Sequence, residues 1–477
     1  MTTTVQVPTY GLYIDGRWKE KQVTFEVLNK YNQTTIAHVA SAEKQDVDEA
    51  VASAKQALKL PLSPYERFTY LKKAAELLIK RKEEVANVLV QEVGKPITES
   101  LGEVERAAQT LEISAEEAKR IHGEGVPVEA APGSETRQAY TKRVPVGVVA
   151  AITPFNVPLN LVCHKIGPAL ASGNSVILKP AEVTSISAII LMQIFEEVGL
   201  PRGRFNLITG NGAKTGEWLL ENEDVNMFTF TGSPRVGKLI REKAGLRKVS
   251  LELGNNSATI VHNDADIVQA ATLCAQKSFN NAGQVCISVQ RVYVQEEIYQ
   301  KFLDQMKKVT ESLEIGDPSQ STTQIGPMIA EKEAIRVEQW VNEAVSNGAK
   351  IEVGGKRDGV FYAPTILTNV DDSMKVCRQE VFGPVVAVST YRDEEEVISR
   401  VNDSIYGLQA GLFTNSLSFA MKAAEEIEVG GLIINDTSGY RVDQMPYGGM
   451  KQSGSGKEGP KYAIEEMTEE KIVVFNL

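Results

Sequence analysis

Apolar and polar residues alternate with two different periods along the middle of the chain. Short apolar runs predict β-strands at residues 146–153, 175–178, 204–209, 227–231 and 249–253. The stretches between them, such as residues 185–198 and 234–244, carry apolar residues three to four positions apart and predict amphipathic helices. Strands that alternate with helices usually pair in parallel, so this region is predicted to be a doubly wound α/β domain.

The flanking segments extend the pattern in both directions. Upstream, amphipathic helices that would cover the sheet are predicted at residues 50–58, 64–92 and 97–121. Downstream, a second alternating stretch predicts strands near residues 289–294, 385–391, 410–414 and 431–435. Its helices are predicted near residues 297–313, 331–347, 394–402 and 416–427. We therefore expect an α/β protein with two doubly wound domains.

Two further segments, residues 126–144 and the tail at 472–475, fit neither domain. Each predicts an edge strand, and an unpaired edge is a template for association. We expect arms that pair between subunits of a homodimer or homotetramer, although a covered strand within one subunit is the alternative. The expected division is residues 1–123 and 144–253 for the first domain, 254–445 for the second, and 124–143 with 460–477 for a small β oligomerisation arm.

Composition narrows the class of protein. The chain has 477 residues, of which 42% are apolar and 24% charged, as expected for two or three globular domains. A net charge of -11 without a long Lys/Arg run argues against nucleic acid and anionic membranes as partners. The four cysteines form no CxxC or Cys/His cluster, so neither metal nor a disulfide framework is expected. The polar start, residues 1–10, and the lack of an apolar span of ~20 residues predict a cytoplasmic protein.

Cys286 is the first candidate for chemistry. It follows Asn280-Asn281-Ala282-Gly283-Gln284-Val285, where a helical pattern gives way to a strand. On such a turn, free backbone N–H groups can stabilise a thiolate or an oxyanion, whereas a cysteine within a helix packs as a small hydrophobe. A structural thiol is the alternative for Cys286 considered alone.

Two more polar residues end strands at the expected carboxyl edge of the sheet. Glu252 precedes Gly254, and its carboxylate could act as a general base if a dry site raised its pKa. Asn156 follows Pro154-Phe155, and its amide could donate to an oxyanion without adding charge. A salt-bridged or capping glutamate and a turn asparagine are the alternatives.

A nucleotide site is indicated near the same edge. Gly232 and Ser233 join a strand to a helix whose free N–H groups would suit a pyrophosphate, although the GxGxxG motif is absent. Lys179 and Glu182 close another strand, where an adenosine ribose is bound in such sheets; a solvated charge pair is the alternative.

Taken together, the motifs resemble the aldehyde dehydrogenase superfamily from Tyr13-Ile14-Asp15-Gly16 to the carboxyl-terminal tail. Their order and spacing carry the resemblance: Pro154-Phe155-Asn156, Lys179-Pro180-Ala181-Glu182, Phe230-Thr231-Gly232-Ser233, Glu252-Leu253-Gly254, Gly283-Gln284-Val285-Cys286, Glu380-Val381-Phe382-Gly383-Pro384 and Pro446-Tyr447-Gly448-Gly449.

The resemblance implies oxidation of an aldehyde through a cysteine thiohemiacetal and a thioester. Cys286 would attack the carbonyl, Asn156 would hold the oxyanion, and Glu252 would activate water. Lys165 and Glu458 match positions of a proton relay. The cofactor would be NAD, with NADP possible because Lys179 offsets the repulsion of a 2′-phosphate by Glu182. Cofactor-binding residues would be Thr153, Pro154, Lys179, Glu182, Gly212, Gly232, Ser233, Leu253, Glu380 and Phe382.

One position departs from the family pattern. Asn255 follows Gly254 where the family usually has a second glycine, and asparagine tolerates a left-handed backbone better than most residues. We expect a preserved turn beside Glu252.

The substrate is less well defined than the reaction. Candidate substrate-binding residues lie beside the catalytic motifs: Val157, His164, Val285, Ile287, Arg291, Tyr440 and Arg441. Arg291 matches a position where some semialdehyde-oxidising relatives hold a carboxylate, and arginine suits such bidentate binding. Salt bridges elsewhere are the alternative for Arg291 and Arg441. We expect a short aliphatic aldehyde with a hydroxyl or acidic group, such as lactaldehyde or succinate semialdehyde.

Three other functions stay open on the sequence. They are oxidation of aromatic aldehydes of the benzaldehyde type, thioester cleavage by coenzyme A, and a non-catalytic scaffold. Retention of Glu252 argues against the coenzyme A reaction, and the presence of Cys286, Glu252 and Asn156 argues against a scaffold.

Overall fold

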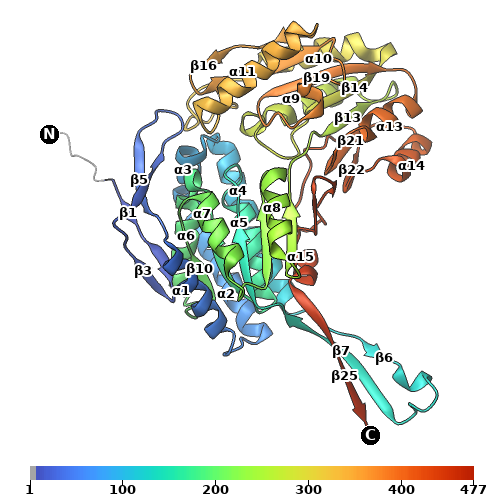
Figure 1. Ribbon diagram of the computed structural model, residues 1–477. Helices are drawn as coiled ribbons and strands as arrows, with labels where there is room; N and C mark the ends of the chain where they lie inside the picture. Colours follow the sequence, from blue (N-terminus) through green and yellow to red (C-terminus); the bar gives the residue numbers. More distant parts are fainter. Residues whose placement is uncertain (1–6) are drawn as a thin grey trace, which may run out of the picture.

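The computed structural model describes residues 7–477 and consists of two α/β lobes and a projecting β arm (Figure 1). Part of the chain start predicted to be polar, residues 1–6, lies outside this range. Among residues 7–477, no helix is long and apolar enough to cross a membrane.

The first lobe is built on an eight-stranded sheet of order β24-β12-β11-β8-β9-β10-β2-β3. Its five central strands are parallel, as predicted: β12 (Lys248–Glu252), β11 (Met227–Thr231), β8 (Val148–Ile152), β9 (Ser175–Lys179) and β10 (Phe205–Leu207). The edge strands are antiparallel: β24 (Gly454–Ser455), β2 (Leu12–Ile14) and β3 (Arg17–Lys19).

Helices cover both faces of this sheet because its strand residues alternate between two cores. Val149 and Ala151 pack with one set of helices, whereas Val148 and Ala150 pack with the other. The first set comprises α2 (Pro64–Lys80), α3 (Lys82–Val93), α4 (Ile97–Ala118), α5 (Asn160–Ala171) and α6 (Ile186–Glu197). The second comprises α1 (Lys44–Ala57), α7 (Gly212–Glu221) and α8 (Pro234–Ala244). The region is therefore doubly wound.

The helix predicted over residues 64–92 is in fact two helices. Ser63 caps α2 with a reciprocal side-chain and backbone pair involving Glu66. The break falls at Arg81, whose φ of -97° and ψ of 16° are not helical. Gly94, with φ of 82°, then ends α3 in the left-handed conformation that glycine adopts without strain. The continuous amphipathic pattern hid the break because Arg81 suits an exposed helix position.

The second lobe carries a seven-stranded sheet of order β15-β18-β19-β14-β13-β21-β22. All pairs are parallel except β15 with β18. The strands are β15 (Lys350–Val353), β18 (Thr365–Thr368), β19 (Val385–Tyr391), β14 (Arg291–Gln295), β13 (Ala258–Val261), β21 (Gln409–Phe413) and β22 (Gly431–Ile434). The prediction missed β13, β15 and β18, which have four residues each and lie beside polar or glycine-rich turns.

Five main helices accompany this sheet. They are α9 (Ile267–Phe279), α10 (Tyr299–Glu311), α11 (Glu331–Ser346), α13 (Glu394–Asn402) and α14 (Leu417–Glu426). Side chains of α9, α10 and α11 form one buried core with the central strands, and α13 and α14 join a smaller core on β13 and β21. The second lobe is therefore covered on both faces as well.

The two predicted edge strands pair with each other. Strand β7 (Arg137–Pro145) runs antiparallel to β25 (Thr468–Asn476), with Thr141 opposite Ile472, and β6 (Gly125–Val126) lies on the outer side of β7. Together they form the arm that extends from the first lobe (Figure 1). The other edge of β25 pairs with no strand of residues 7–477. Pairing between subunits stays a prediction.

Strand β24 links the chain's carboxyl-terminal part to the first sheet. Gly454 lies opposite Glu252 and Ser455 opposite Leu251. Gly454 has a φ of 140°, and a Cβ atom there would overlap the carbonyl oxygen of Leu251. A glycine is therefore required where the segment that carries Glu458 approaches Glu252.

This close approach predicts that Gly454→Ala lowers the free energy of unfolding by about 2 kcal/mol or more, because it adds both overlap and backbone strain. Gly102→Ala on α4 is the matched control, because no atom lies within 4 Å of its added Cβ. That control should gain about 0.5–1 kcal/mol from helix propensity. Chemical denaturation measures both, and equal stability of the two variants would contradict the account.

Candidate active site

Cys286 is positioned by an unusual backbone segment after α9. In the short 3-10 helix η3 (Asn280–Gly283), three successive residues have positive φ: 49° at Asn281, 53° at Ala282 and 70° at Gly283. A Cβ atom at Gly283 would overlap the carbonyl oxygen of Gly383. Left-handed conformations of non-glycine residues cost roughly 1–3 kcal/mol and occur often at functional sites. The surrounding contacts must therefore hold this turn in place.

Reciprocal amide bonds supply those contacts and bring Asn156 to the cysteine turn. The Asn156 amide donates to the Gln284 carbonyl oxygen at 2.8 Å, and the Asn281 amide donates to the Asn156 carbonyl oxygen at 3.1 Å. Gln284 also donates to the Asn281 carbonyl oxygen at 3.0 Å and accepts from the Ile329 N–H at 2.9 Å. A primary amide has two N–H bonds, so Asn156 retains one for an oxyanion.

The Cys286 thiol lies half-buried against an apolar cluster. Ile287, Leu408 and Tyr447 form the cluster, and Val285 packs on it beside the cysteine. The Tyr447 hydroxyl oxygen is 2.8 Å from the Cys286 sulfur. Burial raises the pKa of the Cys286 thiol to about 11, although the Tyr447 hydrogen bond and Arg441 act in the opposite direction. Tyr447 is not among the predicted site residues, and it lies 161 positions from the cysteine in the sequence.

Glu252 ends β12 as a buried carboxyl group. Neither carboxyl oxygen has a hydrogen-bond partner among residues 7–477. Burial, followed by repulsion from Glu458, raises the pKa of Glu252 well above its ordinary value. Gly448 leaves room for the carboxyl group, since a Cβ atom there would come within 2.9 Å of Glu252 Oε1. A carboxyl group with raised pKa and no partner can take a proton from a bound water.

Glu458 has the opposite environment. Lys165 Nζ lies 3.1 Å from its Oε1 atom and the Arg441 guanidinium 2.8 Å from its Oε2 atom, while the Thr231 hydroxyl donates at 3.2 Å. Burial alone raises the pKa of Glu458, but the two cations outweigh it and hold the pKa at about 2. Glu458 therefore stays ionised, and Glu252 is the carboxyl group of the pair that holds a proton more readily.

A second set of buried polar side chains surrounds Asp443, which is not among the predicted site residues. His164 Nε2 lies 2.9 Å from Asp443 Oδ1, Arg106 donates to both carboxylate oxygens at 2.8 and 3.1 Å, and Asn160 donates at 3.0 Å. Burial and the nearby Arg441 charge lower the pKa of His164, so its ring is neutral. His164 Nδ1 and Arg441 Nε have no partner among residues 7–477. These nitrogen atoms are available to a polar substrate.

The predicted substrate residues do not all meet here. Val285 and Ile287 flank the nucleophile, and Val157 is half-buried beside Asn156. The Tyr440 side chain is 44% exposed, and within residues 7–477 its hydrogen bonds involve only its backbone. Its place at the substrate site stays a prediction.

Arg291 is bonded within the second lobe. It lies on β14, and its guanidinium donates to the carbonyl oxygens of Asn256 at 3.0 Å and Arg400 at 3.3 Å, and to the Tyr293 hydroxyl at 3.1 Å. These bonds use the guanidinium to satisfy buried polar groups within the second lobe. The acceptors are carbonyl and hydroxyl oxygens, so these bonds are not salt bridges. The expected role of Arg291 in holding a substrate carboxylate stays a prediction.

Lys179, Glu182 and Gly212 come together at one edge of the first sheet. The Gly212 N–H donates to Glu182 at 3.2 Å, and a Cβ atom on Gly212 would lie 3.7 Å from Lys179 Nζ. Burial lowers the pKa of Lys179 to about 8, and Glu182 partly offsets this effect. Within residues 7–477, Lys179 Nζ donates one hydrogen bond, to the Pro180 carbonyl oxygen at 2.9 Å, so it has further N–H bonds to donate. These groups fit a ribose with free hydroxyls.

The other predicted nucleotide residues continue along that edge. Ser233 caps α8, which begins with Pro234, and Gly232 donates to the Glu252 carbonyl oxygen at 3.0 Å. Buried Leu253 contacts the Gly237 position, where a Cβ atom would be too close to it. Thr153 Oγ1, beside Pro154, is buried without a partner among residues 7–477. The unsatisfied Thr153 hydroxyl and the N-terminus of α8 suit a dinucleotide.

Glu380 and Phe382 lie on the side of Cys286 and the Pro154-Phe155-Asn156 segment. The Phe382 ring meets Phe155 edge to face with centroids 5.8 Å apart. Glu380 accepts from the Asn255 N–H at 3.0 Å, and burial raises its pKa to about 7. The carboxyl group of Glu380 approaches Gly254 closely enough to exclude a side chain there.

Asn255 does not use a left-handed conformation, since it is not among the residues with positive φ. Its side chain instead donates to the Ser257 hydroxyl at 2.5 Å and accepts from the Leu408 N–H at 3.5 Å. Side-chain hydrogen bonds therefore hold Asn255 in its turn, and not the left-handed backbone that the sequence suggested.

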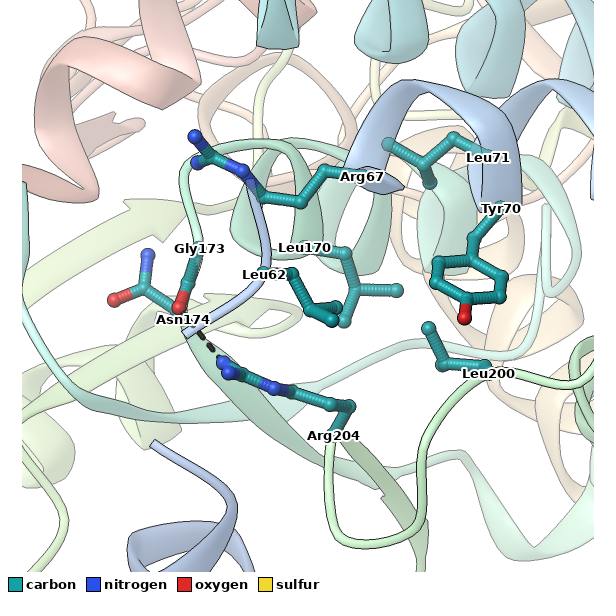
Figure 2. Close-up of a pocket in the computed structure, with 9 residues that line it drawn as sticks. All are labelled: Leu62, Arg67, Tyr70, Leu71, Leu170, Gly173, Asn174, Leu200 and Arg204. Atoms are coloured by element: carbon teal, nitrogen blue, oxygen red, sulfur yellow. Dashed lines mark hydrogen bonds between the residues drawn. The ribbon is translucent and has the colours of Figure 1, made fainter. Parts of the chain in front are cut away.

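The described residues offer no competing centre. Within residues 7–477, no group of three His, Cys, Asp or Glu side chains could hold a metal ion. The cavity in Figure 2 lies between Leu62, Tyr70, Leu170, Leu200 and Arg204 and contains none of the predicted site residues. Arg204 there donates to the carbonyl oxygens of Gly173 and Leu60.

Comparisons with known proteins find relatives along nearly the whole chain. The model of the aldehyde dehydrogenase family matches residues 18–473. A 3-sulfolactaldehyde dehydrogenase from Priestia aryabhattai is 70% identical over 477 residues, covering all of both chains. A lactaldehyde dehydrogenase from Methanococcus maripaludis is 42% identical over 98% of this chain and all of its own. The crystal structure of aldehyde dehydrogenase 21 from Physcomitrella patens with succinate has a TM-score of 0.96, 37% identity and 99% coverage of both chains.

Proposed function

The chain belongs to the aldehyde dehydrogenase family, and we propose that it oxidises a short hydroxyaldehyde with an anionic group, such as 3-sulfolactaldehyde, to the acid. It is an oxidoreductase that uses NAD or NADP. The observation that carries the assignment is the grouping of Cys286, Asn156 and Glu252 through buried contacts of both lobes.

Cys286 performs the first step. Its thiolate attacks the aldehyde carbon, a carbon–sulfur bond forms, and the carbonyl electron pair moves to oxygen. The free N–H of Asn156 stabilises this oxyanion as a neutral donor fixed in place before the reaction. When bound, NAD or NADP accepts the hydride that leaves the substrate carbon and so leaves a thioester on Cys286.

Glu252 acts in the second step. Its raised pKa favours taking a proton from water, whose oxygen then attacks the thioester carbon while the carbon–sulfur bond breaks. Glu458 keeps its charge and orients Lys165 and Arg441, so it does not compete for the same proton. A buried base for water supports hydrolysis over thioester cleavage by coenzyme A.

The substrate class is supported by charge as well as by relatives. Lys165 and Arg441 together bind the single carboxylate of Glu458, and Arg441 also favours negative charge on the Cys286 sulfur. Among residues 7–477, Arg441 Nε and neutral His164 Nδ1 have no partner. The Arg441 N–H can donate to a sulfonate oxygen, and His164 Nδ1 can accept from a substrate hydroxyl, because its Nε2 faces Asp443. The 70% identical Priestia relatives are 3-sulfolactaldehyde dehydrogenases. An aromatic aldehyde such as benzaldehyde has no sulfonate or hydroxyl group that these polar atoms could bind.

The cofactor proposed is NAD, because Glu182 offers its carboxylate to ribose hydroxyls, with NADP as the alternative through Lys179. A cytoplasmic location remains our prediction from composition.

We also propose a homo-oligomer, because the open edge of β25 exposes Ile472, Val474 and Phe475. Sedimentation velocity should give a dimer or tetramer. A monomer at micromolar concentration would contradict this assembly.

Glu252→Gln should separate the two steps. It keeps the shape of the side chain but removes the base, so a burst of NADH equal to the enzyme concentration should persist while steady-state turnover falls by about 10²–10⁴-fold. The wild-type rate of deacylation should rise with pH as Glu252 loses its proton. Stopped-flow absorbance of NADH measures both. A variant that lost the burst together with turnover would contradict the assigned role.

An aldehyde panel tests the substrate class. We expect kcat/KM to fall from 3-sulfolactaldehyde to lactaldehyde by about 10-fold or more, as loss of a charge-assisted hydrogen bond predicts, and to be lowest for benzaldehyde. Arg441→Lys keeps the charge but removes Nε, so it should lower the ratio of kcat/KM for 3-sulfolactaldehyde to kcat/KM for lactaldehyde. Tyr65→Phe, at an exposed position of α2, is the control. A preference for benzaldehyde would refute the proposal.

A further inference from the structure

Tyr447 contacts the reacting sulfur through a hydroxyl for which the mechanism above has no use. We propose that the Tyr447 hydroxyl is a catalytic hydrogen-bond donor that stabilises the Cys286 thiolate, and that Arg441, stacked on the tyrosine ring, is its positioning residue. This inference rests on the proposed role of Cys286 as nucleophile. Its first support is the distance of 2.8 Å between the hydroxyl oxygen and the sulfur.

The hydroxyl is the donor in this pair for two reasons. Burial raises the pKa of Tyr447 well above its ordinary value, so the phenol keeps its proton over the working pH range. A thiol is a weak donor, whereas a thiolate is a good acceptor. Loss of the thiol proton therefore strengthens the contact, and the contact in turn lowers the pKa of Cys286.

Packing does not explain the hydroxyl. The ring of Tyr447 is 3% exposed and lies in the apolar cluster with Ile287 and Leu408. A phenylalanine ring would fill the same space without burying a polar atom, which is the less costly choice unless the polar atom makes a useful bond. In the part of the chain that the structure describes, the hydroxyl has one hydrogen-bond partner, the Cys286 sulfur.

Two sets of contacts hold the tyrosine in place. Its backbone N–H donates to the Glu458 carbonyl oxygen at 3.1 Å, and the Glu458 N–H donates back to the Tyr447 carbonyl oxygen at 2.6 Å. The Arg441 guanidinium carbon lies 3.7 Å from the ring centroid while the same group is bonded to Glu458. A cation on the ring face is attracted to the ring and draws electron density from it, which makes the hydroxyl a better donor.

The charges that face the thiol act in both directions. Arg441 favours the thiolate, whereas Glu380 and Glu252 disfavour it. Behind them, Glu458 is balanced by Lys165 as well as by Arg441. Burial has the largest effect on the pKa of Cys286 and opposes its ionisation. The hydrogen bond from Tyr447 is the principal local interaction that counteracts this effect.

The test is the pH dependence of Cys286 alkylation in Tyr447→Phe without substrate. Iodoacetamide reacts with the thiolate, and mass spectrometry of the Cys286 peptide reports the rate. We expect the midpoint to rise by about one to two pH units relative to wild type, as loss of a hydrogen bond to a charged group predicts. The kcat/KM of the variant at pH 7 should fall about 10–100-fold and recover part of the loss at high pH.

Tyr65→Phe is the matched control, because it removes a hydroxyl from a tyrosine on α2 that is 70% exposed and is not a predicted site residue; its midpoint should equal the wild-type value. An unchanged midpoint in Tyr447→Phe would overturn the inference while leaving Cys286 as nucleophile. NADH production by Cys286→Ala would instead overturn the proposed function, so the two failures are distinguishable.

Discussion

The reciprocal amide bonds between Asn156 and the turn at residues 281–284 are the interaction on which the site depends. Asn156 follows β8 of the first sheet, and the turn precedes β14 of the second. These bonds therefore join the ends of two separately packed cores and fix the oxyanion donor relative to the nucleophile. They also restrain three residues with positive φ, which no local preference of the sequence would maintain.

Charge is divided unequally between the two buried glutamates. Glu458 has two cationic partners and stays ionised, whereas Glu252 has no hydrogen-bond partner among residues 7–477 and holds its proton more tightly. The β24 pairing brings them close enough to repel each other, so ionisation of one raises the proton affinity of the other. Two residues of the same type therefore have different roles: Glu252 is the base for water, and Glu458 is a carboxylate that stays charged.

Much of this arrangement was predictable because it depends on local periodicity and on motif order. The helices at Pro234–Ala244 and Glu394–Asn402 and the strands at Met227–Thr231 and Val385–Tyr391 coincide with the prediction. Their patterns are strong because each buries a defined face. Four-residue strands such as β13 have no period to detect, and the break at Arg81 lies in a continuous amphipathic pattern.

The site was predictable where strand ends fix it and unpredictable where distant segments meet. Closeness in sequence to Cys286 does not by itself place Arg291 at the site, because it does not determine which way a strand residue points. Tyr447 and Asp443 were missed because their partners lie 161 and 279 or more positions away. Asn255 kept its turn through side-chain bonds that only the folded environment supplies.

The most direct test of the account is where the substrate becomes covalently attached during turnover. Acid quench of Glu252→Gln with NAD and 3-sulfolactaldehyde, followed by peptide mass spectrometry, should locate one acyl group on Cys286. An acyl group on another side chain, or none at all while NADH is formed, would contradict the central claim that this sulfur carries the intermediate.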